Sequence, residues 1–114
     1  MDGDPIARVR ALAASLPGVE DRSGPGAVRL DVGGKGIAWT LNERMHPKKP
    51  RVPAPEVLAV GCDQARKEFL LEAAPDRFYS TPHYAGYPAV LVRLAAVDDA
   101  ELLDLLTAAA ARRR

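Results

Sequence analysis

The residues best suited to chemistry in this chain lie in one short stretch, Thr81-Pro82-His83-Tyr84-Ala85-Gly86-Tyr87-Pro88. His83 is a candidate general acid or base, because imidazole titrates near neutral pH and several tyrosines stand nearby in the sequence. A general base also needs an orienting carboxylate or a nucleophile, and no acidic residue lies between Asp76 and Asp98. The pattern therefore favours a histidine whose ring bonds to the backbone and fixes the turn. It assigns no catalytic set and leaves acid–base catalysis by His83 as the open alternative.

The same stretch predicts a rigid turn followed by an apolar strand from Ala89 to Leu94. Its prolines restrict φ and favour extended neighbours, and its glycine permits a tight bend. The tyrosines are suited to stacking on a base or another ligand, and equally to filling core at a sheet edge. The candidate residues, structural or ligand-facing, are Thr81, Pro82, His83, Tyr84, Gly86, Tyr87 and Pro88.

A second candidate is the most basic internal segment of the chain, which lies between two apolar runs and is rich in proline. From residue 44 to residue 51 it contains no acidic residue, and its cations are Arg44, Lys48, Lys49 and Arg51. Prolines exclude a helix here and predict a stiff, extended loop from Asn42 to Pro55. Such a loop is either a solvated connector or a phosphate-contacting arm, which Lys35 on the preceding hairpin turn would extend.

The remaining motifs exclude most other chemistry. His46 and His83 are the only imidazoles and have no metal-ligand spacing, so we expect neither a metal nor a cofactor. No serine lies in a G-x-S-x-G context, and the glycines near Lys35 do not form a phosphate-binding loop. Cys62 precedes an expected helix, where a thiol can be activated, but a small buried filler is the favoured interpretation. A single cysteine also favours a reducing, cytoplasmic setting.

The composition is that of an ordinary globular domain: 114 residues, 47% hydrophobic and 27% charged. We therefore expect one domain over residues 1–114, as a monomer or small homo-oligomer. The net charge of +1 gives no global attraction to nucleic acid, so any such binding needs a local patch. No apolar run approaches the roughly 20 residues that span a bilayer, so we expect no membrane association.

The elements that must position these residues follow from hydrophobic periodicity. Helices are expected after Asp4 as far as Leu16, after Asp63 and after Asp98, because each of these aspartates can cap a helix. In the second of these helices the expected apolar side comprises Ala65, Phe69, Leu70 and Ala73.

Alternating apolar residues predict a β-hairpin from Val28 to Leu41, which turns at the glycines between its two strands. A short apolar run over residues 57–60 predicts a central strand. The expected class is therefore α+β, an antiparallel sheet with helices packed on one side.

At the stretch T-P-H-Y-A-G-Y-P and the strand that follows it, the chain closely resembles the MmcQ/YjbR family. The segments Leu16–Glu20 and Arg51–Val60, and a closing helix that begins near Asp98, resemble it as well. The resemblance implies an α+β fold likened to the CyaY/frataxin-type sandwich and described as a double-wing architecture. It also implies a predicted DNA-binding role, with no established catalytic residues.

Two hypotheses follow. The first is weak, phosphate-mediated binding of nucleic acid through the basic loop. The second is a non-enzymatic ligand-binding or protein-interaction module centred on the turn around His83.

Overall fold

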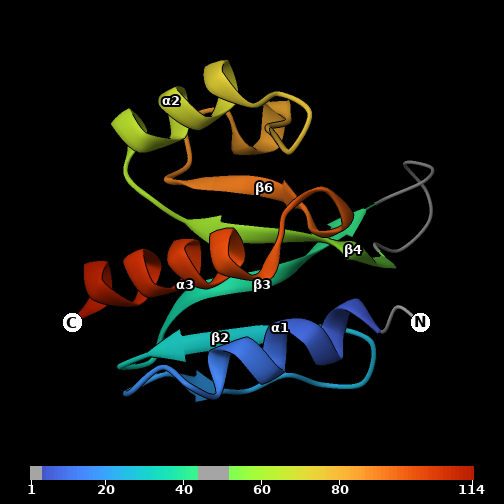
Figure 1. Cartoon of the computed structure of the whole chain (residues 1–114), viewed down its shortest axis with the longest axis vertical. Coiled ribbons are helices and arrows are strands. Elements are labelled where there is room, and N and C mark those ends of the chain that lie inside the picture. The colour runs from blue at the N-terminus through green and yellow to red at the C-terminus, as the bar shows by residue number, and fades with distance from the viewer. Residues whose placement is uncertain (1–3, 44–51) are drawn as a thin grey trace.

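The arrangement of helices and strands comes from a computed structural model, which describes residues 4–43 and 52–114. In chain order the elements are α1 (Pro5–Ala13), β1 (Glu20–Asp21), β2 (Arg29–Val32), β3 (Lys35–Glu43), β4 (Val52–Gly61), α2 (Gln64–Ala73), β5 (Phe78–Tyr79), η1 (Pro82–Tyr84), β6 (Ala89–Arg93), η2 (Leu94–Ala96) and α3 (Asp99–Arg113). The strands form one antiparallel sheet in the order β1-β2-β3-β4-β6-β5. Helices α1 and α3 lie against one face of this sheet (Figure 1). The expected α+β class is confirmed.

The three helices begin where the capping residues predict. The carboxylates of Asp4, Asp63 and Asp98 each accept a hydrogen bond from a backbone N–H two or three residues later, at 2.7–2.9 Å. Helix α1 ends at Ala13 instead of Leu16, because the next residues form tighter turn bonds before Pro17. Among the described residues, no helix is long and apolar enough to cross a membrane.

The expected hairpin is the pair β2 and β3, and it turns at Gly33 and Gly34. Both residues have positive φ values, 59° and 80°, which suit a two-residue hairpin turn and which glycine adopts without strain. Strand β3, which follows this turn, carries Trp39 and Leu41 on one face. The two glycines close the hairpin, and a β-bulge between Leu30 and Asp31 then shifts the register, so that Trp39 pairs with Arg29.

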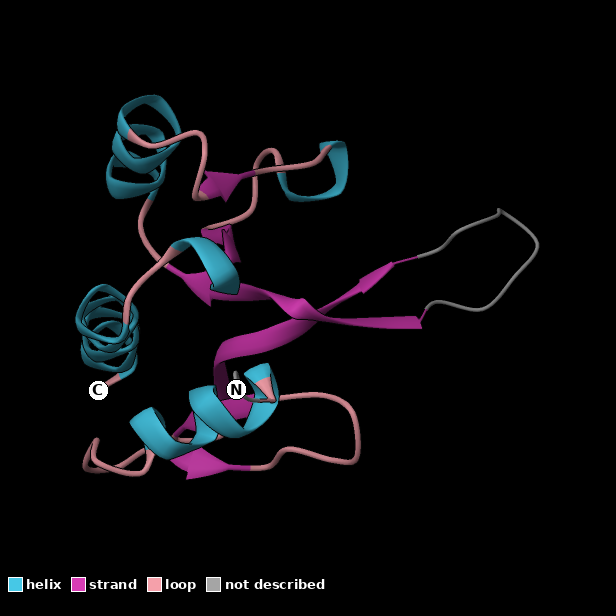
Figure 2. Cartoon of the chain, turned by 45° about the vertical axis from the view of Figure 1, so that its right-hand side comes forward, coloured by secondary structure: helices cyan, strands magenta, loops and turns pink. Residues whose placement is uncertain are grey.

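Strand β4 is longer than its apolar run predicts. The prediction of a loop that continues to Pro55 is therefore wrong. Residues Val52–Pro55 are strand, and Pro53 pairs with Asn42 of β3. Within β4, only Val57–Gly61 pair with β6, so the proline-containing half of β4 has β3 as its one neighbouring strand. Proline is tolerated there because one side of the strand needs no N–H donor. This half of β4 and the outer part of β3 extend away from the body (Figure 2).

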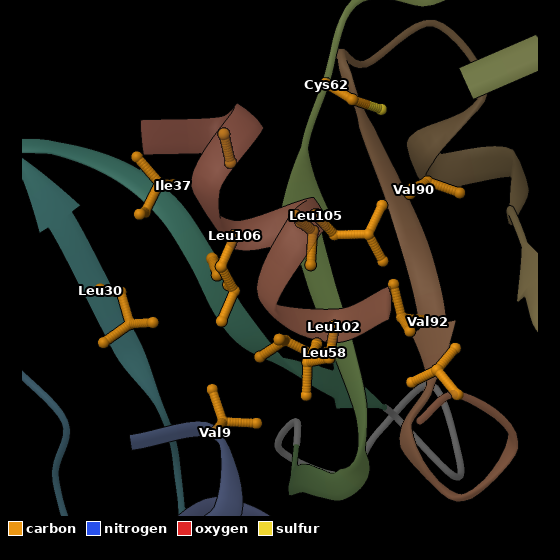
Figure 3. Packing of buried hydrophobic residues seen from close by; sticks show 14 of the residues in the cluster. Val9, Leu30, Ile37, Leu58, Cys62, Val90, Val92, Leu102, Leu105 and Leu106 are labelled. Atoms are coloured by element: carbon orange, nitrogen blue, oxygen red, sulfur yellow. The ribbon is translucent and has the colours of Figure 1, made fainter. Parts of the chain in front are cut away.

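The main core lies between the sheet and helices α1 and α3. Leucines 102, 105 and 106 of α3 face Leu30, Ile37 and Leu58 of the sheet (Figure 3). The apolar side expected for α2 is confirmed only at Leu70, and its other three residues are exposed. Phe69 is 66% exposed, and the buried residues of that helix and its cap are Lys67, Leu70 and Ala74. These three are spaced by three and four residues, so they form one face of the helix.

Candidate functional site

The turn that contains His83 covers part of the sheet face opposite the main core. Alternate residues of β4 and β6 point to this face, as the period of a β-strand requires. With Tyr84 of η1 they form a second buried cluster, which comprises Leu41, Val57, Ala59, Tyr84, Ala89 and Leu91. Tyr84 is 9% exposed, so the ring closes this cluster from above. Tyr84 is therefore a core residue on this face of the sheet.

The turn is fixed to helix α2 by a buried lysine that the sequence did not single out. Lys67 is 2% exposed, and its Nζ donates hydrogen bonds to the carbonyl oxygens of Tyr84 and Tyr87, the latter at 2.8 Å. Gln64 adds a bond from its Nε2 to the carbonyl of Gly86 at 3.0 Å. Burial lowers the pKa of the Lys67 ammonium from its ordinary value. The lysine thus holds both ends of the tyrosine pair in place.

Three aromatic rings meet edge to face at the outer side of the turn. Tyr87 lies 6.1 Å from Trp39 and 5.8 Å from Tyr84, centroid to centroid, with interplanar angles of 89° and 83°. The Nε1–H of Trp39 donates to the hydroxyl oxygen of Tyr84 at 3.0 Å. Tyr87 is nevertheless 47% exposed. The cluster is therefore ordered by its neighbours and still presents ring surface to solvent.

His83 does not have the environment that either sequence interpretation requires. Its ring is exposed and packs against Tyr84 at 5.2 Å, and within the described part of the chain it bonds to no backbone group. The expected backbone-locked histidine is therefore not found there. No carboxylate-bearing residue lines the adjoining pocket, so the described geometry supplies no acid–base pair.

The aromatic cluster forms one wall of an open pocket of about 290 Å³, where the turn meets the β2–β3 hairpin and the end of α3. Its lining residues are Arg29, Gly36, Trp39, His83, Tyr84, Tyr87 and Arg113. Gly36 permits this arrangement, since a Cβ there would lie 3.0 Å from the guanidinium carbon of Arg29. The pocket combines exposed rings with two arginines, and neither arginine is among the site residues predicted from the sequence.

The Arg29 guanidinium is held in position by a buried carboxylate. Its Nε donates to Oδ1 of Asp31 at 2.6 Å, and Asp31 is only 5% exposed. The Nε of Arg22 lies 3.5 Å from the other carboxylate oxygen. The two Nη groups of Arg29 have no acceptor among residues 4–43 and 52–114, and the guanidinium of Arg113 has no bond or ion pair there either. Guanidinium donors of this kind are suited to binding an anion.

The structure divides the predicted site residues into three groups. His83, Tyr84 and Tyr87 line the pocket, whereas the other candidate residues of the turn do not. Lys35 is exposed and lies at the start of β3. At about 3.3 Å per residue, it is about 26 Å along the strand from Glu43, where β3 ends. The remaining basic candidates lie outside the described residues, and they are Arg44, Lys48, Lys49 and Arg51.

Cys62 is buried, as expected for a small filler residue. Burial raises the pKa of its thiol, so the thiolate form is disfavoured. In the part of the chain that the structure describes, no three His, Cys, Asp or Glu side chains gather in a way that could hold a metal ion.

Comparison with known proteins agrees with this fold and defines its family. The crystal structure of Deinococcus radiodurans protein DR2400, a DUF419 protein, has a TM-score of 0.65 to this chain at 21% identity, covering 92% of this chain and 77% of that one. It shares the α+β fold. A family model described as YjbR matches residues 14–109, and the chain belongs to the YjbR family.

Two mycobacterial relatives are similar over most of the chain. The uncharacterized proteins Rv2570 of Mycobacterium tuberculosis and Mb2600 of Mycobacterium bovis are each 34% identical over 85 residues, which covers 68% of this chain and 66% of the relative. The match thus spans just under two thirds of each relative's length. Their names assign no activity.

Proposed function

We propose that this chain is a non-enzymatic binding protein for a small anionic ligand, which it takes in the pocket beside the turn at His83. One observation carries the proposal: within the described residues, two arginines with unpaired guanidinium donors meet an exposed aromatic cluster in a single cavity that no carboxylate lines. Ligand sites are commonly concave, with apolar or aromatic walls and a few placed polar groups. The volume of about 290 Å³ suits one small molecule.

The supporting structure around the pocket is rigid on both sides. Asp31 fixes Arg29, and Lys67 fixes the carbonyls that flank Tyr87. Side chains held in this way lose less conformational entropy when a ligand binds. The arrangement is therefore suited to recognition. Among the described residues no carboxylate lines the pocket beside His83, which favours binding over acid–base catalysis.

Phenyl phosphate is a suitable first probe, because it carries one anionic group and one ring. We expect it to raise the melting temperature of the wild-type protein and to have little effect on Arg113→Ala. Arg112→Ala is the matched control, since Arg112 neighbours Arg113 in the same helical turn but lies against Gly61, away from this pocket. Equal shifts for wild type and Arg113→Ala, or no shift for either, would contradict the proposal.

A second candidate function is phosphate-mediated binding of DNA by the basic segment of residues 44–51. The observation that favours it is the pair of strands β3 and β4, whose outer parts extend from the body and flank this segment in sequence (Figure 2). Four cations would give about four phosphate contacts and a slope of log K against log salt near −4.

This second candidate is tested by fluorescence anisotropy of labelled DNA across a salt series. Neutralising Lys48, Lys49 and Arg51 together should flatten the salt slope. Unchanged binding by this triple variant would show that the segment does not contact DNA. If Arg113→Ala binds DNA as the wild type does, the DNA site is separate from the anion pocket.

The cellular setting is part of the same proposal. A single free thiol fits a reducing cytoplasm, and we infer that location for the chain. Its partner is then a soluble anion, with nucleic acid as the second candidate, and the chain acts as a monomer or small homo-oligomer.

A further inference from the structure

We propose that the ligand of the pocket is a nucleotide unit with a terminal phosphate, bound by the phosphate on Arg29 and Arg113 and by the base on the ring cluster of Trp39 and Tyr87. This inference rests on the proposed function and names the chemical class of its ligand. Its two sources are a free nucleoside monophosphate and the phosphorylated end of a nucleic-acid strand.

The charges of the pocket favour a phosphomonoester over a phosphodiester. A monoester carries close to two negative charges at neutral pH, and a diester carries one. Two guanidinium groups line the pocket, and the one carboxylate that contacts a lining residue, among the described residues, is Asp31 behind Arg29. Asp31 uses the Nε of Arg29, so both Nη groups stay available for phosphate oxygens. Arg113 has no carboxylate partner in the same part of the chain.

The remaining volume favours a base beside the phosphate. One water takes up about 30 Å³ in the liquid, so a cavity of about 290 Å³ is far larger than a phosphate group requires. Tyr87 forms part of its wall and is 47% exposed, although two rings already support it. Stacking of a base on such a ring accepts any base, because each base has a π-face.

The residues that would bind the phosphate and the base come from neighbouring parts of the fold. Arg29 and Trp39 are paired neighbours on β2 and β3, and Tyr87 contacts Trp39 from the turn. Arg113 comes from the last turn of α3. A nucleotide unit is suited to this arrangement, because its phosphate and base are joined by a short sugar.

Tryptophan fluorescence measures binding at this site directly, because Trp39 is the one tryptophan of the chain. The experiment is a titration of tryptophan fluorescence with inorganic phosphate, adenosine and adenosine 5′-monophosphate, excited at the red edge of tryptophan absorption. We expect the monophosphate to quench Trp39 and to bind at least about tenfold more tightly than phosphate or adenosine alone, as one charge-assisted hydrogen bond supplies about that factor. Arg113→Ala should remove this advantage, and Arg112→Ala should retain it.

Oligonucleotides with and without a 5′-phosphate distinguish the two sources. Tighter binding of the phosphorylated strand than of the free monophosphate identifies a strand end, and the reverse order identifies the free nucleotide. Equal binding of the two strands excludes the strand end as the source. The inference as a whole is overturned if adenosine 5′-monophosphate then also binds no more tightly than phosphate or adenosine.

The inference and the proposed function fail in different ways. If phenyl phosphate binds through Arg113 and adenosine 5′-monophosphate binds no more tightly, the nucleotide class is wrong and the anion site remains. If neither binds, both are wrong.

Discussion

Replacing Lys67 by methionine removes the buried ammonium and keeps a long, flexible apolar side chain. The ammonium donates to the carbonyl oxygens of Tyr84 and Tyr87, and bonds to a charged group are worth about 1.5–3 kcal/mol each, or about 3–6 kcal/mol together. Relief from burying an ion offsets several kcal/mol of this loss. Both carbonyls also keep backbone partners, so neither is orphaned. We therefore expect Lys67→Met to lower the free energy of unfolding by about 1–3 kcal/mol near neutral pH.

The pH dependence of this difference has a definite sign. Burial lowers the pKa of Lys67 below its usual 10.5, so between the two values the unfolded chain binds more protons than the folded chain. The stability contribution of Lys67 therefore increases as pH rises through that window, and the methionine variant lacks this gain. We expect the stability gap between wild type and Lys67→Met to widen from about pH 7 to about pH 10.

Urea unfolding followed by Trp39 fluorescence measures this gap. The other titratable groups are common to both proteins, and contributions that do not depend on Lys67 cancel in the difference. Lys35→Met is the matched control, since Lys35 is exposed and its removal should leave the gap near zero. A gap that narrows as pH rises would refute the reasoning, because it would mean that the folded state favours the charged lysine.

Three further predictions concern the core, the stability at low pH and the pocket. Leu106→Ala removes a side chain with no exposed surface, and urea unfolding should show a loss of about 2–5 kcal/mol; a smaller loss would contradict the packing of α3. Burial raises the pKa of Asp21, but hydrogen bonds led by that from Arg10 outweigh this and lower it from 3.8 to about 2. The wild type should therefore lose its stability advantage over Asp21→Asn as pH falls from about 4 to about 2; parallel acid curves would contradict this. Gly36→Ala should displace the Arg29 guanidinium and weaken phenyl phosphate binding, with stability nearly unchanged; unchanged affinity would place Arg29 outside the site.

Local signals in the sequence predicted the ends of most helices and the hairpin. Asp63 and Asp98 cap their helices because a short carboxylate reaches backbone N–H groups a few residues away, which needs no tertiary contact. The Gly33–Gly34 turn is local for the same reason. The prolines near residue 55 misled the prediction of β4, because proline is unfavourable only where a second neighbouring strand requires the missing N–H.

The short apolar run over residues 57–60 predicted a central strand, and in the structure its residues alternate between the two buried faces of the sheet. Leu58 and Val60 face the main core, and Ala59 faces the cluster under Tyr84. What the pattern could not supply is the identity of the layer that covers each face. Phe69 was expected inside and lies outside, because α2 packs at the edge of the sheet and buries the face with Lys67.

The sequence by itself determined the α+β class, the helix caps, the hairpin and the turn at His83, since each depends on residues within a few positions of one another. The tertiary structure decided the site. Arg29, Trp39, Tyr87 and Arg113 come from four separate elements, and only the packed sheet and α3 bring them to one pocket. Lys67 was likewise decided by packing, because a lysine becomes a buried clamp only when carbonyls from a distant turn reach it. Contacts between residues far apart in the chain leave no local spacing in the sequence.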